Sequence, residues 1–217
     1  MSAVFVLRAL GALLSYPNAD MREALPEITQ VVSEAGLIRQ SDRSAILSLI
    51  DELRAIDPME AEERYVELFD HSRATSLYLF EHLHGEARDR GQAMVELKHI
   101  YQQAGFELSG RELPDYLPVL LEYLSCRDLT EARSMLGDCA DILRAIGEAM
   151  AQRSSPYVVV LQALLSIAGA VPVDVVSASR QRPVVQDLDR DWAEQPAFAE
   201  RAGPRATPRR APDGRVR

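Results

Sequence analysis

Apolar residues recur three and four positions apart through most of residues 1–170, and no stretch shows the apolar-polar alternation that marks a half-buried strand. The three-four spacing gathers apolar side chains on one face of an α-helix. Leu7, Leu10 and Leu14 form one such face near the start of the chain. The pattern therefore predicts an all-α fold, organised as a single-domain helical bundle.

Capping residues mark two of the predicted helix starts. Asp57 stands before Pro58 and Glu60, so an acidic N-cap precedes a proline whose missing N–H would have had no partner in the first turn. Asp115 is placed in the same way to cap a helix that has Pro118 in its first turn.

A long helix is predicted from about residue 87 to residue 104, with Gly105 at its end. A later helix is predicted to include both Leu129 and Ile146. The residues that the long helix is expected to bury are Ala93, Met94, Leu97, Ile100 and Tyr101.

The helical periodicity fades past about Asp174, and residues 193–217 are rich in Ala, Pro, Gly and Arg. Such a composition cannot bury enough apolar surface to fold. We therefore expect a helical domain over residues 1–175 and a flexible, disordered, Arg/Pro-rich tail over residues 176–217. Residues 171–176 fit either a short strand or an extended exit from the domain.

The formal net charge of −9 is unevenly distributed. The residues from Gln181 onward include eight Arg and six acidic residues, so this tail carries +2 and residues 1–180 carry −11. An acidic body repels phosphate backbones and anionic lipids, and it attracts basic peptides. We expect a protein partner and no nucleic acid.

The sequence predicts neither membrane insertion nor export. The most apolar run, Tyr157–Ala170, is shorter than the ~18 consecutive apolar residues of a spanning helix. The apolar start, Ala3–Leu14, carries Arg8 in its middle and lacks a basic leading region and a cleavage pattern. Cys126 and Cys139 have no metal-ligand spacing, which favours a reducing compartment. We expect a cytoplasmic protein.

The histidines raise the question of a metal or general-base site. His82 and His84 are the best pair, yet residues two apart on a helix point about 200° apart, whereas the zinc-binding HExxH motif places its histidines four apart. Histidines that bond carbonyls or pack against neighbours are the favoured alternative. The chain also lacks a nucleophile signature and a phosphate-binding loop. We expect no enzyme activity, no metal and no stably bound cofactor.

Two charged residues are placed where charge is costly. Asp89 and Arg90 lie one helical turn before Ala93 and Met94, on the predicted apolar side of the long helix. An unpaired charge buried there costs several kcal/mol. Asp89 and Arg90 therefore either pair with another helix or line a groove that a ligand completes.

Three stretches of the chain closely resemble the NarJ family, the chaperones dedicated to respiratory nitrate reductase. The stretches are Glu63–Asp70 (ERYVELFD), Leu79–Met94 (LFEHLHGEARDRGQAM) and Glu112–Pro118 (ELPDYLP). The resemblance covers roughly residues 4–170 and is most specific in these middle motifs.

The resemblance implies an all-helical fold of the redox-enzyme maturation type without catalytic activity. It further implies a chaperone that binds the N-terminal region of the nitrate reductase catalytic (alpha) subunit and keeps it competent for molybdenum cofactor insertion. Such a chaperone delays membrane docking until maturation is complete and is absent from the final enzyme. Molybdenum cofactor biosynthesis proteins are further candidate partners.

The client segment is expected to lay an amphipathic helix into a groove of the bundle, anchored by buried apolar side chains and oriented by acidic ones. For each aromatic residue, ordinary core packing is the alternative. The candidate client-binding residues are Tyr65, Glu67, Phe69, Asp70, Leu79, Phe80, Glu81, His82, His84, Glu86, Arg88, Asp89, Arg90, Asp115, Tyr116 and Tyr123.

Three other functions compete with peptide binding. Arg88 and Arg90, near the histidines, could meet the phosphate groups of the molybdenum cofactor and make the protein a cofactor handler. His82 and His84 with carboxylates would make it a metal-dependent hydrolase. A permanent scaffold of a larger assembly is the last alternative.

Overall fold

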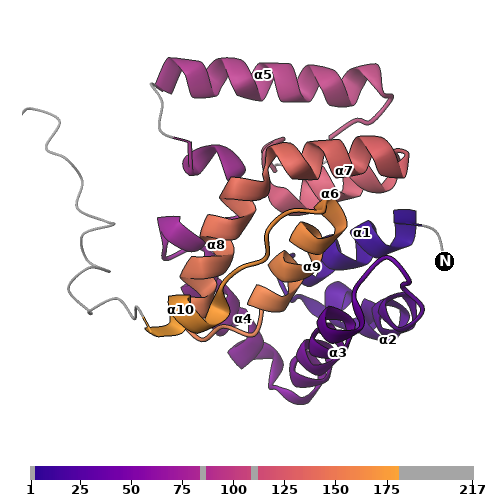
Figure 1. Ribbon diagram of the computed structural model, residues 1–217, viewed down its shortest axis with the longest axis vertical. Helices are drawn as coiled ribbons and strands as arrows, with labels where there is room; N and C mark the ends of the chain where they lie inside the picture. The colour runs from indigo at the N-terminus through magenta and orange to yellow at the C-terminus, as the bar shows by residue number, and fades with distance from the viewer. Residues whose placement is uncertain (1–2, 84–86, 109–111, 181–217) are drawn as a thin grey trace, which may run out of the picture.

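The computed structural model describes residues 3–83, 87–108 and 112–180, and the regular elements in these ranges are helices (Figure 1). The predicted all-α fold is confirmed. The helices are α1 (Ala3–Leu13), α2 (Ala19–Ser33), α3 (Gln40–Ala55), α4 (Pro58–Phe69), α5 (Ala87–Gln103), α6 (Leu117–Ser125), α7 (Leu129–Asp138), α8 (Ala140–Gln152), α9 (Val158–Ala168) and α10 (Val175–Arg180), with the short 3-10 helices η1 (Arg73–Thr75) and η2 (Leu79–Glu81).

Helix α9 forms the centre of the bundle. Its residues are apolar on nearly every side, as expected of a helix surrounded by protein. It packs against α3, α7 and α8, and its chain reverses at Gly169, whose φ of 72° favours glycine. Leu161, Leu164 and Leu165 are fully buried in this arrangement.

The second packing layer pairs α1 with α6. Gly11 makes the close approach possible, because a Cβ at this position would lie 3.2 Å from the Leu121 Cβ and 3.3 Å from the Pro118 carbonyl oxygen. The predicted apolar face of α1 is buried, with Leu7, Leu10 and Leu14 almost inaccessible to solvent.

The two predicted helix starts have different outcomes. Asp57 caps α4 as expected, since its carboxylate accepts hydrogen bonds from the backbone N–H groups of Met59 and Glu60. The predicted cap at Asp115 is wrong. Tyr116 precedes α6 without a side-chain cap, and the Asp115 carboxylate instead accepts a hydrogen bond from the Phe80 backbone N–H at 3.0 Å.

The single helix predicted to include both Leu129 and Ile146 is also wrong. The chain breaks at Cys139 into α7 and α8, although the Cys139 N–H still donates to Met135 and its carbonyl accepts from Leu143. Gly137 weakens the helix just before the break, because glycine loses more conformational freedom on entering a helix than any other residue.

Helix α5 lies along one edge of the assembly, at the top of Figure 1. Tyr101 near its end is fully buried, and Gly105 ends the segment with a φ of 74°. The predicted burial of Ile100 is wrong, because its side chain is 43% exposed, and Val95 is 64% exposed. The helix therefore rests on the bundle mainly through its C-terminal half.

The chain leaves α9 through residues 170–174 without forming a strand, so the extended exit is correct for residues 171–174, whereas Val175 and Val176 begin α10. Helix α10 follows and packs against α8, with Ala178 buried. The packed part thus continues to residue 180. The predicted tail beyond that residue lies outside the described residues, and the division at residue 175 stays a prediction.

Candidate functional site

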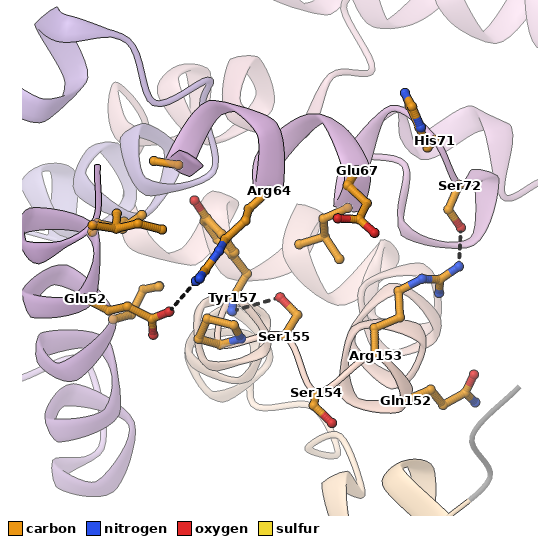
Figure 2. A pocket seen from close by; sticks show the side chains of 16 residues that line it. Glu52, Arg64, Glu67, His71, Ser72, Gln152, Arg153, Ser154, Ser155 and Tyr157 are labelled. Atoms are coloured by element: carbon orange, nitrogen blue, oxygen red, sulfur yellow. Dashed lines mark hydrogen bonds and ion pairs between the residues drawn. The ribbon is translucent and has the colours of Figure 1, made fainter. Parts of the chain in front are cut away.

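Two hollows meet at the C-terminal end of α4, and Ser72 lines both of them. The larger pocket, with a volume of about 1020 Å³, lies between α3, α4 and the loop that joins α8 to α9 (Figure 2). The smaller pocket, of about 470 Å³, lies between the end of α4, the following turns and the start of α5. The α4 end therefore presents two surfaces to solvent.

The larger pocket has apolar walls and a charged rim. Leu49 and Leu53 of α3, Leu68 of α4 and Pro156 of the loop supply apolar surface. Arg64 of α4 forms ion pairs with Glu52 at 3.3 Å and with Glu60 at 2.6 Å. In Figure 2 Arg64 points from α4 toward Glu52 of α3, and Glu67 points from α4 into the pocket.

Tyr157 forms the inner wall of this pocket. Its ring packs edge-on against Phe69, with a centroid distance of 5.3 Å, and burial raises the pKa of its hydroxyl. Within the described ranges this hydroxyl has no hydrogen-bond partner. The loop before it contains Ser154 at a φ of 55°, a left-handed conformation that costs a residue with a side chain of order 1 kcal/mol.

A buried contact joins the loop after α4 to the end of α8. The Arg153 guanidinium donates to the Ser72 hydroxyl at 2.6 Å, and Ser72 is only 5% exposed. Arg153 also donates to the Ala149 carbonyl. This contact fixes the wall between the two pockets.

The smaller pocket is polar and gathers residues of both signs. Its acidic members are Asp70 and Glu81, and its basic members are Arg73 and Arg90. Arg73 donates two hydrogen bonds to the Glu81 carbonyl, at 3.0 and 2.7 Å. Arg90 lies 3.6 Å from the Glu81 carboxylate. Arg90 therefore has both of the roles considered for it, because it pairs with Glu81 and also lines a groove.

Asp115 is a buried carboxylate just behind this pocket. Burial raises its pKa, although the hydrogen bond from the Phe80 N–H and the positive charge of Arg90 partly oppose the shift. One carboxylate oxygen has no hydrogen-bond partner within the described ranges. Asp115 thus holds η2 against the start of α6, because Leu79 N–H also donates to its carbonyl.

Tyrosines connect the pocket to the core. The rings of Tyr78 and Tyr116 stack with their centroids 5.0 Å apart, and the Tyr116 and Tyr65 hydroxyls lie 3.0 Å apart. Tyr65 also donates to the Leu14 carbonyl at 2.8 Å, and burial raises its pKa. Tyr78 reaches the surface, where it donates to Glu112.

The structure brings some of the predicted client-binding residues together and separates others. The smaller pocket gathers four of them, and the larger pocket is lined by one more, Glu67. The four in the smaller pocket are Phe69, Asp70, Glu81 and Arg90.

Other predicted residues lie in the core. Tyr65 and Leu79 are buried, and Tyr123 is 2% exposed, stacked on Tyr101 and donating to Glu131. A client can reach these side chains only if the bundle opens. Phe80 and Tyr116 are half-buried, so their exposure is intermediate between that of a surface residue and that of a core residue.

His82 has one of the roles favoured for the histidines, since its Nε2 lies 2.8 Å from the Ser76 carbonyl oxygen. His84 and Glu86 lie outside the described residues, as do the side chains of Arg88 and Asp89. The proposed phosphate contact of Arg88 therefore stays a prediction, and Arg90 is already paired with Glu81.

Sequence reasoning missed the α8–α9 loop and four residues of the smaller pocket, Ser72, Arg73, Ser76 and Tyr78. Tyr78 lies immediately before the Leu79–Met94 motif, and this position in the sequence could have indicated that it belongs to the same site. The α8–α9 loop carried no comparable signal, because its partners α3 and α4 are about a hundred residues away in sequence.

The described part of the chain contains neither a group of candidate metal ligands nor a candidate spanning helix. No three His, Cys, Asp or Glu residues there are grouped so that they could hold a metal ion. None of the helices described is both long enough and apolar enough to cross a membrane.

The fold and these surfaces define the class of protein as an all-helical bundle with two surface pockets beside the end of α4. The chain belongs to the family described as nitrate reductase delta subunit, whose model matches residues 17–162. The resemblance to the NarJ family is confirmed by relatives that match over most of their length.

One relative is the nitrate reductase molybdenum cofactor assembly chaperone NarJ of Escherichia coli (strain K12), which is 42% identical over 86% of this chain and 81% of its own. Another is the probable chaperone of the same name from Bacillus subtilis (strain 168), 32% identical over 73% of this chain and 85% of its own. Assembly chaperones are not enzymes, and this protein is not an enzyme.

The nitrate reductase-like protein NarX of Mycobacterium tuberculosis (strain ATCC 25618 / H37Rv) is 29% identical over 70% of this chain but only 22% of its own length. The same type of sequence thus also occurs as a small part of a much longer protein.

Proposed function

We propose that this protein is the dedicated chaperone of a nitrate reductase. It binds the N-terminal region of the catalytic (alpha) subunit, keeps that subunit competent for molybdenum cofactor insertion and delays its docking to the membrane until loading is complete. It then leaves the finished enzyme. The observation that carries this proposal is the 42% identity to a molybdenum cofactor assembly chaperone over 86% of the chain.

The physical properties of the chain support the proposal. Residues 1–180 carry a charge of −11, which speeds encounter with a basic segment. The smaller pocket combines a half-buried aromatic ring, Tyr78, with the exposed carboxylate of Asp70. Such a pair suits an amphipathic client, because the ring anchors an apolar side chain and the acid orients a basic one.

In this proposal the protein works in the cytoplasm, where the client is still unloaded, and it holds no cofactor of its own. Molybdenum cofactor biosynthesis proteins would deliver the cofactor to the bound client. The chaperone contributes binding and timing, and the client contributes the cofactor site.

Calorimetry with a synthetic peptide of the alpha subunit's N-terminal segment tests the proposal. We expect Tyr78→Ala to weaken binding roughly thirtyfold, the loss of ~2 kcal/mol that defines an interface hot spot. Asp70→Asn should weaken it about fivefold or less, because an exposed ion pair contributes ~0 to 1 kcal/mol.

Tyr16→Ala is the matched control, since Tyr16 is also a partly exposed tyrosine but lies outside both pockets. Tyr78→Phe separates the ring from the hydroxyl, and circular dichroism checks that each variant is folded. Equal loss of affinity in Tyr16→Ala and Tyr78→Ala would contradict a binding site at the smaller pocket. Absence of binding by the folded wild type at low salt would contradict direct client recognition.

A further inference from the structure

The larger pocket has no role in the client surface proposed above, and it lies in the most acidic part of the fold. Between Gln40 and Asp70, the segment that contains α3 and α4, the chain has nine acidic and three basic residues, a net charge of −6. The pocket lining itself has two acidic residues, Glu52 and Glu67, and two arginines, Arg64 and Arg153, so the negative charge comes from the surrounding segment. The pocket therefore offers apolar walls beside a net negative segment of the surface, which suits a positively charged, partly apolar segment.

The route of the chain after α9 leads to this pocket. Arg144, in the first half of α8, donates to the Val171 carbonyl, and a Cβ added to Gly147 would meet Val173 at 2.5 Å. The exit segment thus runs along α8 from its first half toward its C-terminal end. Gln162 of α9 secures it by hydrogen bonds to both the N–H and the carbonyl of Val173.

Helix α10 continues in the same direction. It packs against α8 and lies below Ser154 in Figure 2, where the pocket loop begins. Gln152 and Arg153 at the end of α8 line the pocket. The described chain therefore ends in a helix, α10, that packs on α8, and the last residues of α8 line the pocket.

Part of the sequence beyond Arg180 has the charge that complements the acidic segment of α3 and α4. Residues 201–217 contain six Arg and one Asp, a net charge of +5, together with three Pro. Residues 181–200 contain five acidic residues and two Arg, a net charge of −3. Only the last part of the tail is complementary to the segment that carries α3 and α4.

We infer that residues 201–217 dock in the pocket between α3, α4 and the α8–α9 loop of the same chain. The intervening 20 residues, 181–200, can span up to about 70 Å when extended, whereas the 13 residues of α8 are ~20 Å long. A short tether of this kind gives an effective concentration in the millimolar range, so weak charge pairs suffice. A basic segment of another protein that reaches this pocket must first displace the tail.

Paramagnetic relaxation measured by NMR on the full chain tests this inference. A nitroxide is attached through Asp213→Cys in a chain that also carries Cys126→Ser and Cys139→Ala. We expect the backbone amide signals of Glu67, Ser154 and Tyr157 to lose most of their intensity, and that of Val95 on distant α5 to keep it. The broadening should disappear near 1 M salt, where the Debye length falls to about 3 Å.

Two sets of tail substitutions, each made in the labelled full chain, give the matched comparison. Changing the Arg residues of segment 201–217 to Gln should abolish the broadening, and changing Asp187, Asp189 and Asp191 to Asn should preserve it. Uniform or absent broadening in the labelled parent would overturn the inference. Broadening that grows with protein concentration would assign the tail to the pocket of a second copy and would overturn the intramolecular arrangement. None of these measurements uses a client peptide, so the result stands apart from that of the proposed function.

Discussion

The same apolar periodicity predicts both α9 and α5, yet the two helices differ in how deeply they are buried in the bundle. Seven of the 11 residues of α9 are buried, and the helix packs against α3, α7 and α8. In α5 the described side chains include one buried residue, Tyr101, while Val95 and Ile100 are exposed. Helical pattern alone does not place a helix, because most helical stability comes from the neighbours that cover its apolar face.

The attachments of α5 are correspondingly local. Tyr101 donates to the Pro114 carbonyl at 2.8 Å and stacks on Tyr123 at 4.6 Å. Nearer the start of the helix, Arg90 forms an ion pair with Glu81 at 3.6 Å, and both side chains are partly exposed. Few buried contacts mean low local stability, so the first half of α5 should open before the centre of the bundle does.

The largest test of this comparison is in α9. Leu164→Ala should lower the free energy of unfolding by about 2–5 kcal/mol, because it removes a fully buried side chain and leaves a cavity. Guanidinium unfolding followed by circular dichroism measures the change. Leu164→Met, which conserves volume, should cost less than about 1.5 kcal/mol. A loss below 1 kcal/mol for the alanine variant would show that α9 is not the packing centre.

The next test is at the junction between the two regions. Asp115→Ala should cost about 1–3 kcal/mol of unfolding free energy, since it leaves the Phe80 N–H without its acceptor. Glu112 is a nearby exposed carboxylate, so Glu112→Ala should cost much less unfolding free energy. Similar losses for the two variants would mean that the buried hydrogen bond contributes little.

Asp115 also predicts a pH dependence. Burial raises its pKa in the folded state above the unfolded value, so its stabilising contribution is greatest below the unfolded pKa and is lost as pH rises through the folded pKa. Relative to Asp115→Asn, the wild type should therefore lose unfolding free energy as the pH rises from the acidic range toward neutrality. Parallel stability curves for the two proteins would contradict the raised pKa.

A smaller effect is expected at the anchor of α5. Tyr101→Phe keeps the ring stack but removes the hydrogen bond to Pro114, which should cost about 1 kcal/mol. Hydrogen exchange should accelerate in α5 and remain unchanged in α9. Equal acceleration in both helices would show that α5 and α9 open together as one unit.

The smallest effect is expected on the outer face of α5. Val95→Gln should change the unfolding free energy by less than about 0.5 kcal/mol, because Val95 is 64% exposed. The same substitution at Val160 in α9, which is fully buried, serves as the contrast and should be strongly destabilising. A large loss at Val95 would indicate that this face is covered in solution.

Much of the fold could be predicted because it depends on local signals. The start of α4 follows from Asp57 and Pro58, and the buried face of α1 from leucine spacing. The role of Asp115 could not be predicted, because its hydrogen-bond partner, Phe80, is 35 residues away. The same holds for Ile100, whose exposure depends on how far α5 stands from its neighbours.

The candidate site was predictable to a similar extent. Phe69, Asp70, Glu81 and Arg90 belong to recognisable motifs, and the fold does gather them. A sequence motif does not show whether an aromatic ring lies in the core or lines a groove. Tyr123 was therefore predicted to bind the client, although it is buried. The larger pocket escaped prediction because its walls come from separate helices that only tertiary packing brings together.

The two ends of the segment 79–115, which contains α5, lie side by side, because the Leu79 N–H donates to the Asp115 carbonyl and the Leu117 N–H donates to the Leu77 carbonyl. In topological terms this segment is an insertion with adjacent ends. Loop-closure entropy grows only logarithmically with length, so doubling such an insertion costs about 0.6 kcal/mol. The exposed turns of α5 are thus the natural place to graft a reporter domain or to lengthen the protein without disturbing the helices around α9.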